Sequence, residues 1–553
     1  MRKYLMAVLL AAAVACIFCS ASSGSTISNI PSEHRIHGYV EELGRRGLLT
    51  GLFFSDRPYA REKVLEALSK LEENAISQGI VLTPYEVWLV TRLREEFQFI
   101  SEASHEERTE SVETGAEFEI AGRSTDSEVT WPPLVYAEDV SGKDVESESE
   151  QLLRGLLFGW VEYWTPHASV SGRFRVDSRI EDDERFLGRP WREDVGGYVS
   201  SGYGRLGIGP FDVLLGRDRL SWGPGRSGSL ILSDLAPPID MVCFGFTLGR
   251  VSASGFFTTL DDVKLSRAVP YQYDSLYAGT AATRHLSGHR IDFRVTPSLE
   301  VGLSETIIYG GPDRELEPGY INPLNFYYAH QWNLVKNDNP LWALDATWWP
   351  TPRLQLYGQL LVDDYQFEHK DERDEEPSEI GFLIGLHSGD PFGLANTSVT
   401  LEYARVNSWT YNQGYEWNRY TYGEALLGHP LGPDADAFYL TVARWFNDRF
   451  TGRFDYRFMR HGEVFVDTDW PVPVAGPWGG ASFPEGFPVG TAAKSHRLDV
   501  LARFHATAHF DVDGFASLEK VSDYSNVTGG ELLVYEVGLR VSFRPEGRLR
   551  LSE

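Results

Sequence analysis

A repeated alternation of apolar and polar residues constrains this chain most strongly. It begins near residue 115 and continues almost to the C-terminus. In 533–543 every odd position holds Leu, Tyr, Val or Phe, whereas the even positions include Glu536, Arg540 and Ser542. Segments 169–177, 352–363 and 496–505 alternate in the same way. A period of two is typical of β-strands with one apolar face. The sequence therefore predicts an all-β architecture after residue 115.

The lengths of the connections show which all-β class to expect. Candidate strands begin near residues 115, 157, 168, 197, 210, 241, 251, 286, 298, 341, 352, 379, 395, 437, 449, 495, 508 and 531. Long connections follow the odd strands and short ones follow the even strands, which is typical of outer-membrane barrels. We therefore predict an all-β membrane barrel of about 18 antiparallel transmembrane strands, with sixteen or twenty as alternatives. The predicted barrel spans residues 111–546 and precedes a C-terminal tail, 547–553.

Aromatic residues stand just before three of the short connections. They are Trp164, Trp348-Trp349 and Trp445-Phe446. Outer-membrane barrels carry aromatic girdles at the membrane interfaces. We expect these residues to belong to the girdle near the short turns, with packing in a protein core as the alternative.

The region before the barrel has a helical pattern instead. Residues 83–86, "TPYE", form a capping box with Pro84 at the first helical position, and apolar residues follow at helical spacing. The segment 60–73 is a second amphipathic helix. We predict a small N-terminal α-helical periplasmic unit within 22–110. It should lie at the short-turn end, because the chain enters its first strand from there.

The first residues have the layout of a secretory signal peptide. Arg2 and Lys3 precede an apolar run and small residues that end at Ala21, which predicts a signal peptide over 1–21. A lipoprotein attached at Cys16 is the alternative. Cys243 would then be the only cysteine, so the exported protein would contain no internal disulfide. The formal net charge of -28 argues against nucleic acid as a partner. We expect a protein of the cell outer membrane that contacts its lipid.

No motif indicates catalysis. Carboxylates occur in pairs at Asp261-Asp262, Asp363-Asp364 and Asp434/Asp436, and we interpret these as strand-end or loop residues. The histidines lack the spacing of metal ligands. We predict no catalytic centre, no metal site and no cofactor.

Arginines on the polar face of the strands suggest two interpretations. They are Arg173, Arg175, Arg290, Arg294, Arg453, Arg457, Arg497, Arg503 and Arg540, and acidic residues of the same parity lie among them. The arginines either pair with these carboxylates inside the lumen or receive an anionic ligand.

Several segments, in this order, resemble the capsule-assembly Wzi family. They are "RLSWGPGRSGSLILSDLAPPID" (219–240), "HRIDFRVTPSLEVGLSETIIYGG" (289–311), "YINPLNFYY" (320–328), "LYGQLLVDDYQF" (356–367) and "LGHPLGPDADAFYL" (427–440), after "SDRPYAREKV" (55–64) in the helical region. The resemblance implies an outer-membrane lectin that binds and anchors capsular or related surface polysaccharide. A porin and an outer-membrane hydrolase are the alternatives.

The loop 216–240 contains the predicted binding residues Arg217, Arg219, Trp222 and Arg226. We expect an external loop ordered by a type II turn at Pro224-Gly225. The Trp222 indole would cover the apolar face of a sugar ring, and the arginines would pair with acidic substituents. The alternative is a structural plug folded into the barrel mouth.

Overall fold

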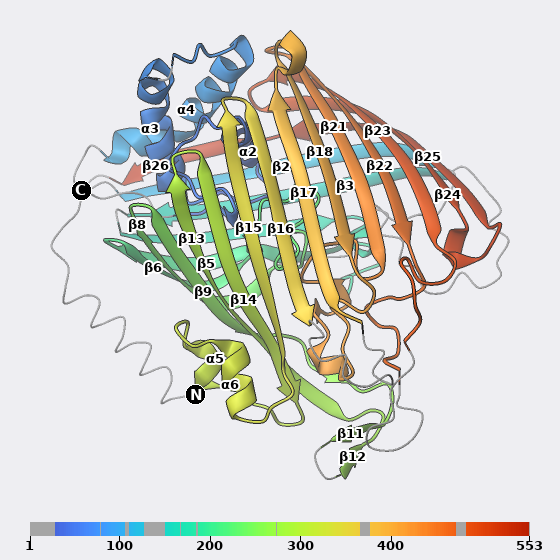
Figure 1. Ribbon diagram of the computed structural model, residues 1–553. Helices are drawn as coiled ribbons and strands as arrows, with labels where there is room; N and C mark the ends of the chain where they lie inside the picture. The colour runs from blue at the N-terminus through green and yellow to red at the C-terminus, as the bar shows by residue number, and fades with distance from the viewer. Residues whose placement is uncertain are drawn as a thin grey trace.

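The structure is a computed structural model that describes residues 28–77, 79–104, 110–125, 150–165, 167–183, 186–271, 274–364, 377–471 and 483–551. The expected signal peptide, 1–21, lies outside these residues. The strands form the wall of a barrel, with three N-terminal helices at one end and two short helices near the other (Figure 1).

Eighteen long antiparallel strands form the wall, which confirms the number predicted from the sequence. The barrel closes because β2 pairs with both β3 and β25. The first nine strands are β2 (Glu110–Thr125), β3 (Glu150–Trp164), β4 (Ala168–Asp177), β5 (Gly196–Ile208), β6 (Phe211–Asp218), β8 (Ile239–Leu248), β9 (Val251–Thr259), β13 (Ala281–Thr296) and β14 (Leu299–Gly311). The other nine are β15 (Asn339–Thr351), β16 (Leu354–Asp364), β17 (Glu379–Gly389), β18 (Thr397–Val406), β21 (Ala435–Asn447), β22 (Phe450–His461), β23 (Ala493–Thr507), β24 (Phe510–Ser522) and β25 (Glu531–Phe543).

The described parts of the connections contain short elements. These are β7 (Ser221–Trp222), β10 (Val263–Lys264), β11 (Val269–Tyr271), β12 (Asp274–Leu276), β19 (Thr421–Tyr422), β20 (Ala425–Leu426), α5 (Pro318–Ile321), α6 (Tyr327–Asn333) and the 3-10 turns η1 (Ile180–Asp182), η2 (Pro391–Gly393), η3 (Glu416–Asn418) and η4 (Tyr524–Asn526). Below, the end of the barrel with the long connections is called the mouth, and the other end is called the turn end.

The predicted C-terminal boundary of the barrel is too early. The sheet continues as β26 (Glu546–Leu551), which pairs with the first residues of β2. Pro545 separates β26 from β25, because proline has no N–H to donate to a neighbouring strand. Its carbonyl oxygen still accepts a hydrogen bond from Ala116 N–H at 3.0 Å. The expected tail therefore continues the last strand as far as Leu551.

Side chains of the wall alternate between the two faces. In β25, Val537 and Leu539 are 57% and 63% exposed on the outside, whereas Glu536 is 9% exposed and faces the lumen. An apolar outer face around a polar interior is the arrangement of a barrel surrounded by lipid.

Three helices form the N-terminal unit: α2 (Arg35–Arg45), α3 (Arg61–Ser77) and α4 (Pro84–Ser104). The predicted capping box is confirmed, since Thr83 N–H donates to Glu86 Oε2 at 2.8 Å and Glu86 N–H donates to Thr83 Oγ1 at 3.3 Å. The helices share one apolar core, which includes Val40, Leu43, Val64, Leu68, Leu89 and Leu93. In the described part of the chain, no helix has both the length and the apolar character needed to cross a membrane.

The helical unit lies against the turn end, as predicted from the chain's path. Arg46 is fully buried there, and its Nη1 lies 3.1 Å from Glu86 Oε1 and 3.0 Å from Asp390 Oδ2 in the β17–β18 turn. Tyr85 N–H donates to Asn396 Oδ1 of the same turn at 3.3 Å. This contact joins α2 and α4 to the barrel wall.

The aromatic residues before the short turns divide between two roles. Trp348 and Phe446 are 46% and 53% exposed on the outer face, as expected of girdle residues. Trp164 is 1% exposed and packs in the core of the helical unit, and Trp445 stacks on Tyr85 with ring centroids 6.0 Å apart. The girdle assignment is wrong for these inward-facing residues, because the helices cover the inner surface at this end.

Candidate functional site

The loop after β6 folds into the barrel instead of projecting from it. Residues 219–238, the inner loop, contain β7 (Ser221–Trp222), which pairs antiparallel with β1 (Asp56–Arg57) of the N-terminal region. Trp222 packs edge-on against Phe256 of β9, with ring centroids 5.4 Å apart. Its carbonyl oxygen accepts a hydrogen bond from Gln359 Nε2 of β16 at 2.7 Å. The inner loop is therefore part of a plug.

Arg57 binds the inner loop to the N-terminal unit. Its Nη2 donates to Ser221 Oγ at 2.9 Å, to the carbonyl oxygen of Gly223 at 3.1 Å and to that of Gly225 at 3.3 Å. These acceptors are neutral, and the carboxylate of Glu41 lies 3.5 Å from Arg57 Nη1. A buried guanidinium that has both hydrogen-bond acceptors and a counter-charge is stable in a protein interior.

The predicted type II turn at Pro224-Gly225 is wrong. Such a turn needs a positive φ at Gly225, but the positive φ of 140° lies at Gly223. Gly223 N–H donates to the carbonyl oxygen of Ser55 at 2.8 Å, which continues the pairing of β7 with β1. The backbone conformation is thus set by this pairing and not by a local turn.

A second loop closes the mouth. Residues 407–434, the mouth loop, are bound to the wall by buried Arg284 of β13, whose Nη2 donates to the carbonyl oxygens of Arg419 at 2.7 Å and Thr421 at 2.8 Å. Ser233 N–H of the inner loop donates to the carbonyl oxygen of Leu427 at 2.9 Å. The two loops therefore support each other, and the plug extends from the helical unit to the mouth.

The carboxylates that occur in pairs in the sequence hold these loops in place. Asp363 Oδ2 accepts a hydrogen bond from Tyr411 N–H at 2.7 Å, and Asp261 Oδ1 accepts one from Gly423 N–H at 2.9 Å. Asp434 Oδ1 accepts one from Val489 N–H at 3.0 Å. These contacts support the loop role that we assigned to the carboxylates from the sequence.

Two aromatic residues and two arginines lie half-buried in the long connections at the mouth, and the Tyr415 ring stacks on buried Trp417 with centroids 4.5 Å apart. We call Arg267, Tyr415, Arg419 and Trp470 the mouth cluster; all four are half-buried. Arg267 Nη1 donates to the carbonyl oxygen of Trp470 at 3.2 Å, and Arg419 Nη2 donates to that of Asp467 at 3.0 Å. The Trp470 ring lies edge-on to Trp409, with centroids 5.3 Å apart.

The electrostatics of the mouth cluster favour an anion. Within the described part of the chain, no carboxylate lies within ion-pair distance of the Arg419 guanidinium, and burial lowers the pKa of this arginine. Arg267 forms a long ion pair, 3.7 Å from its Nε to Oδ1 of exposed Asp469. A partly desolvated guanidinium gains from an incoming carboxylate, and an aromatic ring beside it offers an apolar surface.

The lumen arginines pair with carboxylates, as one of our two interpretations predicted. Arg290 Nη1 lies 2.7 Å from Asp345 Oδ2, and Arg503 Nε lies 2.7 Å from Asp513 Oδ1. The other arginines named from the sequence form the pairs Arg173–Glu162, Arg175–Asp177, Arg294–Glu300, Arg453–Asp455, Arg457–Glu519, Arg497–Asp499 and Arg540–Asp513. Most of the charge on the inner face is therefore already neutralised.

The four binding residues predicted from the sequence do not form one external site. Trp222 is 1% exposed, so the exposed indole that we expected is wrong, and the plug alternative describes the loop. Arg219 is buried beside Glu33, with Nη1 2.6 Å from Oε1. Arg217 faces outward near the mouth and pairs with Asp240.

Arg226 is the remaining predicted residue, and it lies half-buried in the lumen. Its backbone N–H donates to Glu402 Oε2 at 2.8 Å, but its guanidinium makes no ion pair with any residue that the structure describes. Burial, followed by the charges of Arg453 and Arg45, lowers its pKa to about 10. A role of Arg226 or Arg217 in binding stays a prediction.

The mouth cluster is not recognisable as a group in the sequence. Its four residues come from three connections that are far apart in the chain, 260–280, 407–434 and 462–492. Loop positions lack the periodicity that identifies strand faces. The available signal was the presence of Trp and Arg in the long connections, and it does not show which of them meet.

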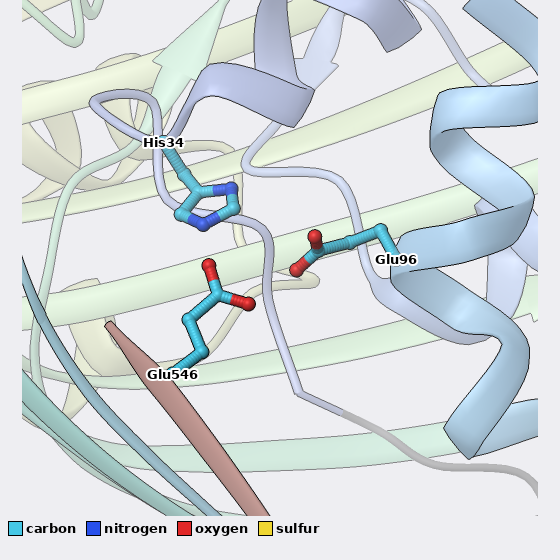
Figure 2. Close-up of side chains that lie close together, drawn as sticks. All are labelled: His34, Glu96 and Glu546. Atoms are coloured by element: carbon cyan, nitrogen blue, oxygen red, sulfur yellow. The ribbon is translucent and has the colours of Figure 1, made fainter. Parts of the chain in front are cut away.

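Three side chains at the turn end, His34, Glu96 and Glu546, point toward one another (Figure 2). Their nitrogen and oxygen atoms lie within 4.8 Å of one another, and they are the one group in the described chain that could hold a metal ion. Arg35 already lies at both carboxylates, with Nη2 3.4 Å from Glu96 Oε2 and 3.8 Å from Glu546 Oε1. Burial and then Arg173 lower the pKa of His34 well below 6.5. The cluster therefore has the character of a structural contact between α4 and β26, with Arg35 as the cation.

Three features define the class of protein: the closed sheet, the apolar outer face, and a lumen filled by segments of the same chain. The protein is an outer-membrane β-barrel that is plugged from within. A model of the family described as "Capsule assembly protein Wzi" matches residues 134–531, and the chain belongs to this family. No curated protein matches the chain in sequence.

Solved structures with a similar fold include the Escherichia coli protein Wzi, an outer-membrane protein involved in group 1 capsule assembly and a carbohydrate-binding β-barrel. It is 14% identical, with a TM-score of 0.58 over 93% of this chain and 99% of that chain. Acinetobacter baumannii OccAB4 is 12% identical, with a TM-score of 0.40 over 79% of this chain and 98% of that chain. Pseudomonas aeruginosa OccK1 is 11% identical, with a TM-score of 0.42 over 79% and 99%. At 14% identity, the likeness to the Escherichia coli barrel shows a shared fold alone.

Proposed function

We propose that this protein is an outer-membrane lectin that binds capsular or related surface polysaccharide and does not cleave it. The observation that carries the proposal is the mouth cluster, which presents half-buried aromatic rings and arginines on the loops that close the barrel. Membership in a capsule-assembly family supports a polysaccharide ligand, and so does the carbohydrate binding of the Escherichia coli barrel.

Binding would use the two chemistries that the mouth cluster combines. The rings of Tyr415 and Trp470 offer surfaces for the C–H faces of sugar rings. The guanidinium of Arg419 favours a sugar that carries a carboxylate or another acidic substituent. Among the residues described, no carboxylate lies within ion-pair distance of it, and Glu416, Asp467 and Asp469 only partly offset the effect of its burial. The proposed ligand is therefore an acidic polysaccharide.

The orientation follows from the connections. Outer-membrane barrels place short turns in the periplasm and long loops outside. We propose that the helical unit, within 22–110, lies in the periplasm and that the mouth cluster faces the cell exterior. In this position the cluster meets polymer at the cell surface.

The plug opposes the alternative of an open channel. The N-terminal unit, the inner loop and the mouth loop are hydrogen-bonded to one another along the lumen. The side chains of Arg453 and Arg540 on the lumen face are 44% and 32% exposed, so part of the interior is accessible to water. Current recordings in planar bilayers would distinguish a steady pore from a plugged barrel. The hydrolase alternative has less support, because Asp261, Asp363 and Asp434 already bind loop N–H groups.

Retention of polysaccharide on cells tests the proposal. Trp470→Ala and Arg419→Ala should each reduce the polymer that stays attached to the cell surface, while the barrel still assembles. Arg449→Ala is a matched control, because Arg449 is an exposed arginine in a turn at the opposite end. If both mouth variants assemble normally and retain as much polysaccharide as the parent, the ligand binds elsewhere.

A further inference from the structure

The connection between β14 and β15 lies on the outside of the barrel and does not join the plug. It spans residues 312–338 and contains α5 and α6, which Figure 1 places beside the ends of β13 and β14. Tyr309 of β14 faces outward. Ser304 of the same strand accepts a hydrogen bond from lumen-facing Arg290, and Tyr309, five residues further along, lies on the opposite face. Tyr309 is fully buried against Tyr320 of α5, with ring centroids 4.7 Å apart. The connection therefore folds back over the outer wall.

Glu305 fixes α6 to this wall. The carboxylate of this outward-facing residue accepts hydrogen bonds from the N–H groups of Tyr327 at 3.0 Å and Tyr328 at 3.1 Å, and from Trp342 Nε1 at 2.9 Å. A charged residue on the outer face is costly where lipid surrounds a barrel. Here α6 covers the carboxylate and satisfies it, since Glu305 is only 4% exposed.

The surface of the connection that faces away from the wall is strongly apolar. Six large apolar side chains are exposed within twelve residues, which is unusual for a loop surrounded by water. They are Leu324, Phe326, Tyr328, Trp332, Leu334 and Val335. Leu324 and Val335 are 93% and 94% exposed.

This apolar surface continues onto the lipid-facing wall. The Phe326 ring stacks on Trp342 of β15, with centroids 5.9 Å apart and planes inclined by 18°. The next residues on the same face of β15 are Leu344 and Trp348, both 46% exposed. An unbroken apolar surface thus extends from the connection along the outside of the barrel.

Four charged residues of the connection, Arg314, Glu317, Lys336 and Asp338, form ion pairs with one another. Arg314 Nε donates to Glu317 Oε1 at 2.6 Å, and Arg314 Nη2 lies 2.9 Å from Asp338 Oδ2. Lys336 also pairs with Glu317. Apolar and aromatic residues on one side and charges on the other are typical of segments that lie in a membrane interface.

We propose that residues 324–335 form an interfacial anchor whose occupant is the outer leaflet of the membrane. Its aromatic and aliphatic side chains insert among lipid chains beside the headgroups, next to β14 and β15. The anchor would fix the depth of the barrel and, with it, the height of the mouth above the membrane. This inference does not depend on polysaccharide binding.

Lipid fits this surface better than sugar does. A sugar site needs polar groups that orient hydroxyls, and the polar and charged atoms of Glu305, Glu317 and Asp338 are engaged within the protein. Continuity with the membrane-facing wall favours lipid over a second protein. If sugar or a second protein covers this surface instead, the quenching experiment gives a different result.

Quenching by spin-labelled lipid tests the anchor on the protein without residues 1–21, which contain Cys16 and Cys19, in liposomes. Leu324→Cys, in a Cys243→Ser background, would be labelled with a bimane fluorophore. Val527→Cys is the matched control, because Val527 is a 61% exposed apolar residue in a connection at the same end of the barrel. We expect several-fold stronger quenching at position 324 than at 527, and loss of this difference in lipid-free detergent.

Equal quenching at the two positions would overturn the proposal. So would a label at position 324 that lipid does not quench but that added polysaccharide or a second copy of the protein protects. Trp332→Ser provides an independent check, since it should reduce quenching at position 324 while the barrel stays folded in detergent. Unchanged quenching in this variant would also contradict insertion.

Discussion

Arg57 lies directly opposite Ser221 in the pairing of β1 with β7, and its guanidinium donates to the Ser221 hydroxyl at 2.9 Å. One residue belongs to the N-terminal helical region and the other to a loop that follows the fifth strand of the barrel. The plug is therefore built from both segments, which are bound to each other.

Replacing Arg57 should weaken the contact between the N-terminal region and the inner loop. Arg57→Ala leaves the carbonyl oxygens of Gly223 and Gly225 without this donor and removes one of the two arginines beside Glu41, which keeps Arg45. The loss of one partner from a buried charge pair costs about 3–5 kcal/mol. We expect a lower unfolding temperature in detergent and measurable current in planar bilayers. Arg250→Ala, at an exposed turn position, is the control and should change neither. A variant as stable and as closed as the parent would contradict the role given to Arg57.

Trp222 should behave as a core residue and not as a ligand contact. Truncating a buried Trp to Ala typically destabilises a protein by about 3–5 kcal/mol. Trp222→Ala should therefore lower the unfolding temperature strongly, whereas Trp332→Ala, which changes a 66% exposed residue, should lower it little. Thermal unfolding followed by heat-modifiable gel migration measures both. Similar small effects would show that Trp222 is not buried.

Acid should weaken the plug through Glu41. Burial alone would raise the pKa of Glu41, but Arg45 and Arg57 outweigh it and hold this pKa at about 2, below the usual 4.5. A carboxyl with a depressed pKa in the folded state contributes stability that is complete above the unfolded pKa and is lost as the pH falls toward the folded one. The contribution of Glu41 should thus disappear between pH 4.5 and 2.

Glu41→Gln is the variant that isolates this effect. Its unfolding free energy, measured by denaturant titration in detergent, should be lower than the parent's above pH 4.5 and should approach it as the pH falls toward 2. A constant difference across this range would show that Glu41 is not the titrating group.

The cluster of His34, Glu96 and Glu546 should not need a metal ion. Because Arg35 lies within 3.8 Å of both carboxylates, a chelator should leave the unfolding temperature of the purified protein unchanged. Arg35→Ala should lower it, since Glu96 and Glu546 would then lose the arginine that lies beside both of them. A clear loss of stability on chelation would identify the cluster as a metal site.

The barrel wall could be predicted because a strand with lipid on one side and water on the other repeats its pattern at every second residue. The predicted start of β17, residue 379, agrees with the structure, and that of β25, residue 531, also agrees. The C-terminal boundary failed at Pro545, because the sequence does not show that pairing with β2 resumes beyond it.

The plug could not be predicted in the same way. Whether Trp222 faces solvent or the lumen depends on β1, which is a two-residue strand far away in the chain. The inward packing of Trp164 and Trp445 likewise depends on where the helices dock. Such contacts are set by tertiary structure, and local patterns of residues do not encode them.

Direct binding of purified protein to polysaccharide tests the central claim. The full chain in nanodiscs would be immobilised and exposed to surface polysaccharide from its own source, with acidic and neutral polymers compared. We predict saturable binding of an acidic polymer, with loss of binding in Trp470→Ala, weaker binding in Arg419→Ala, parental binding in Arg449→Ala, and a decrease at high salt, where charge pairs are screened. Absence of binding by the parent protein, or equal binding by all variants, would contradict the account.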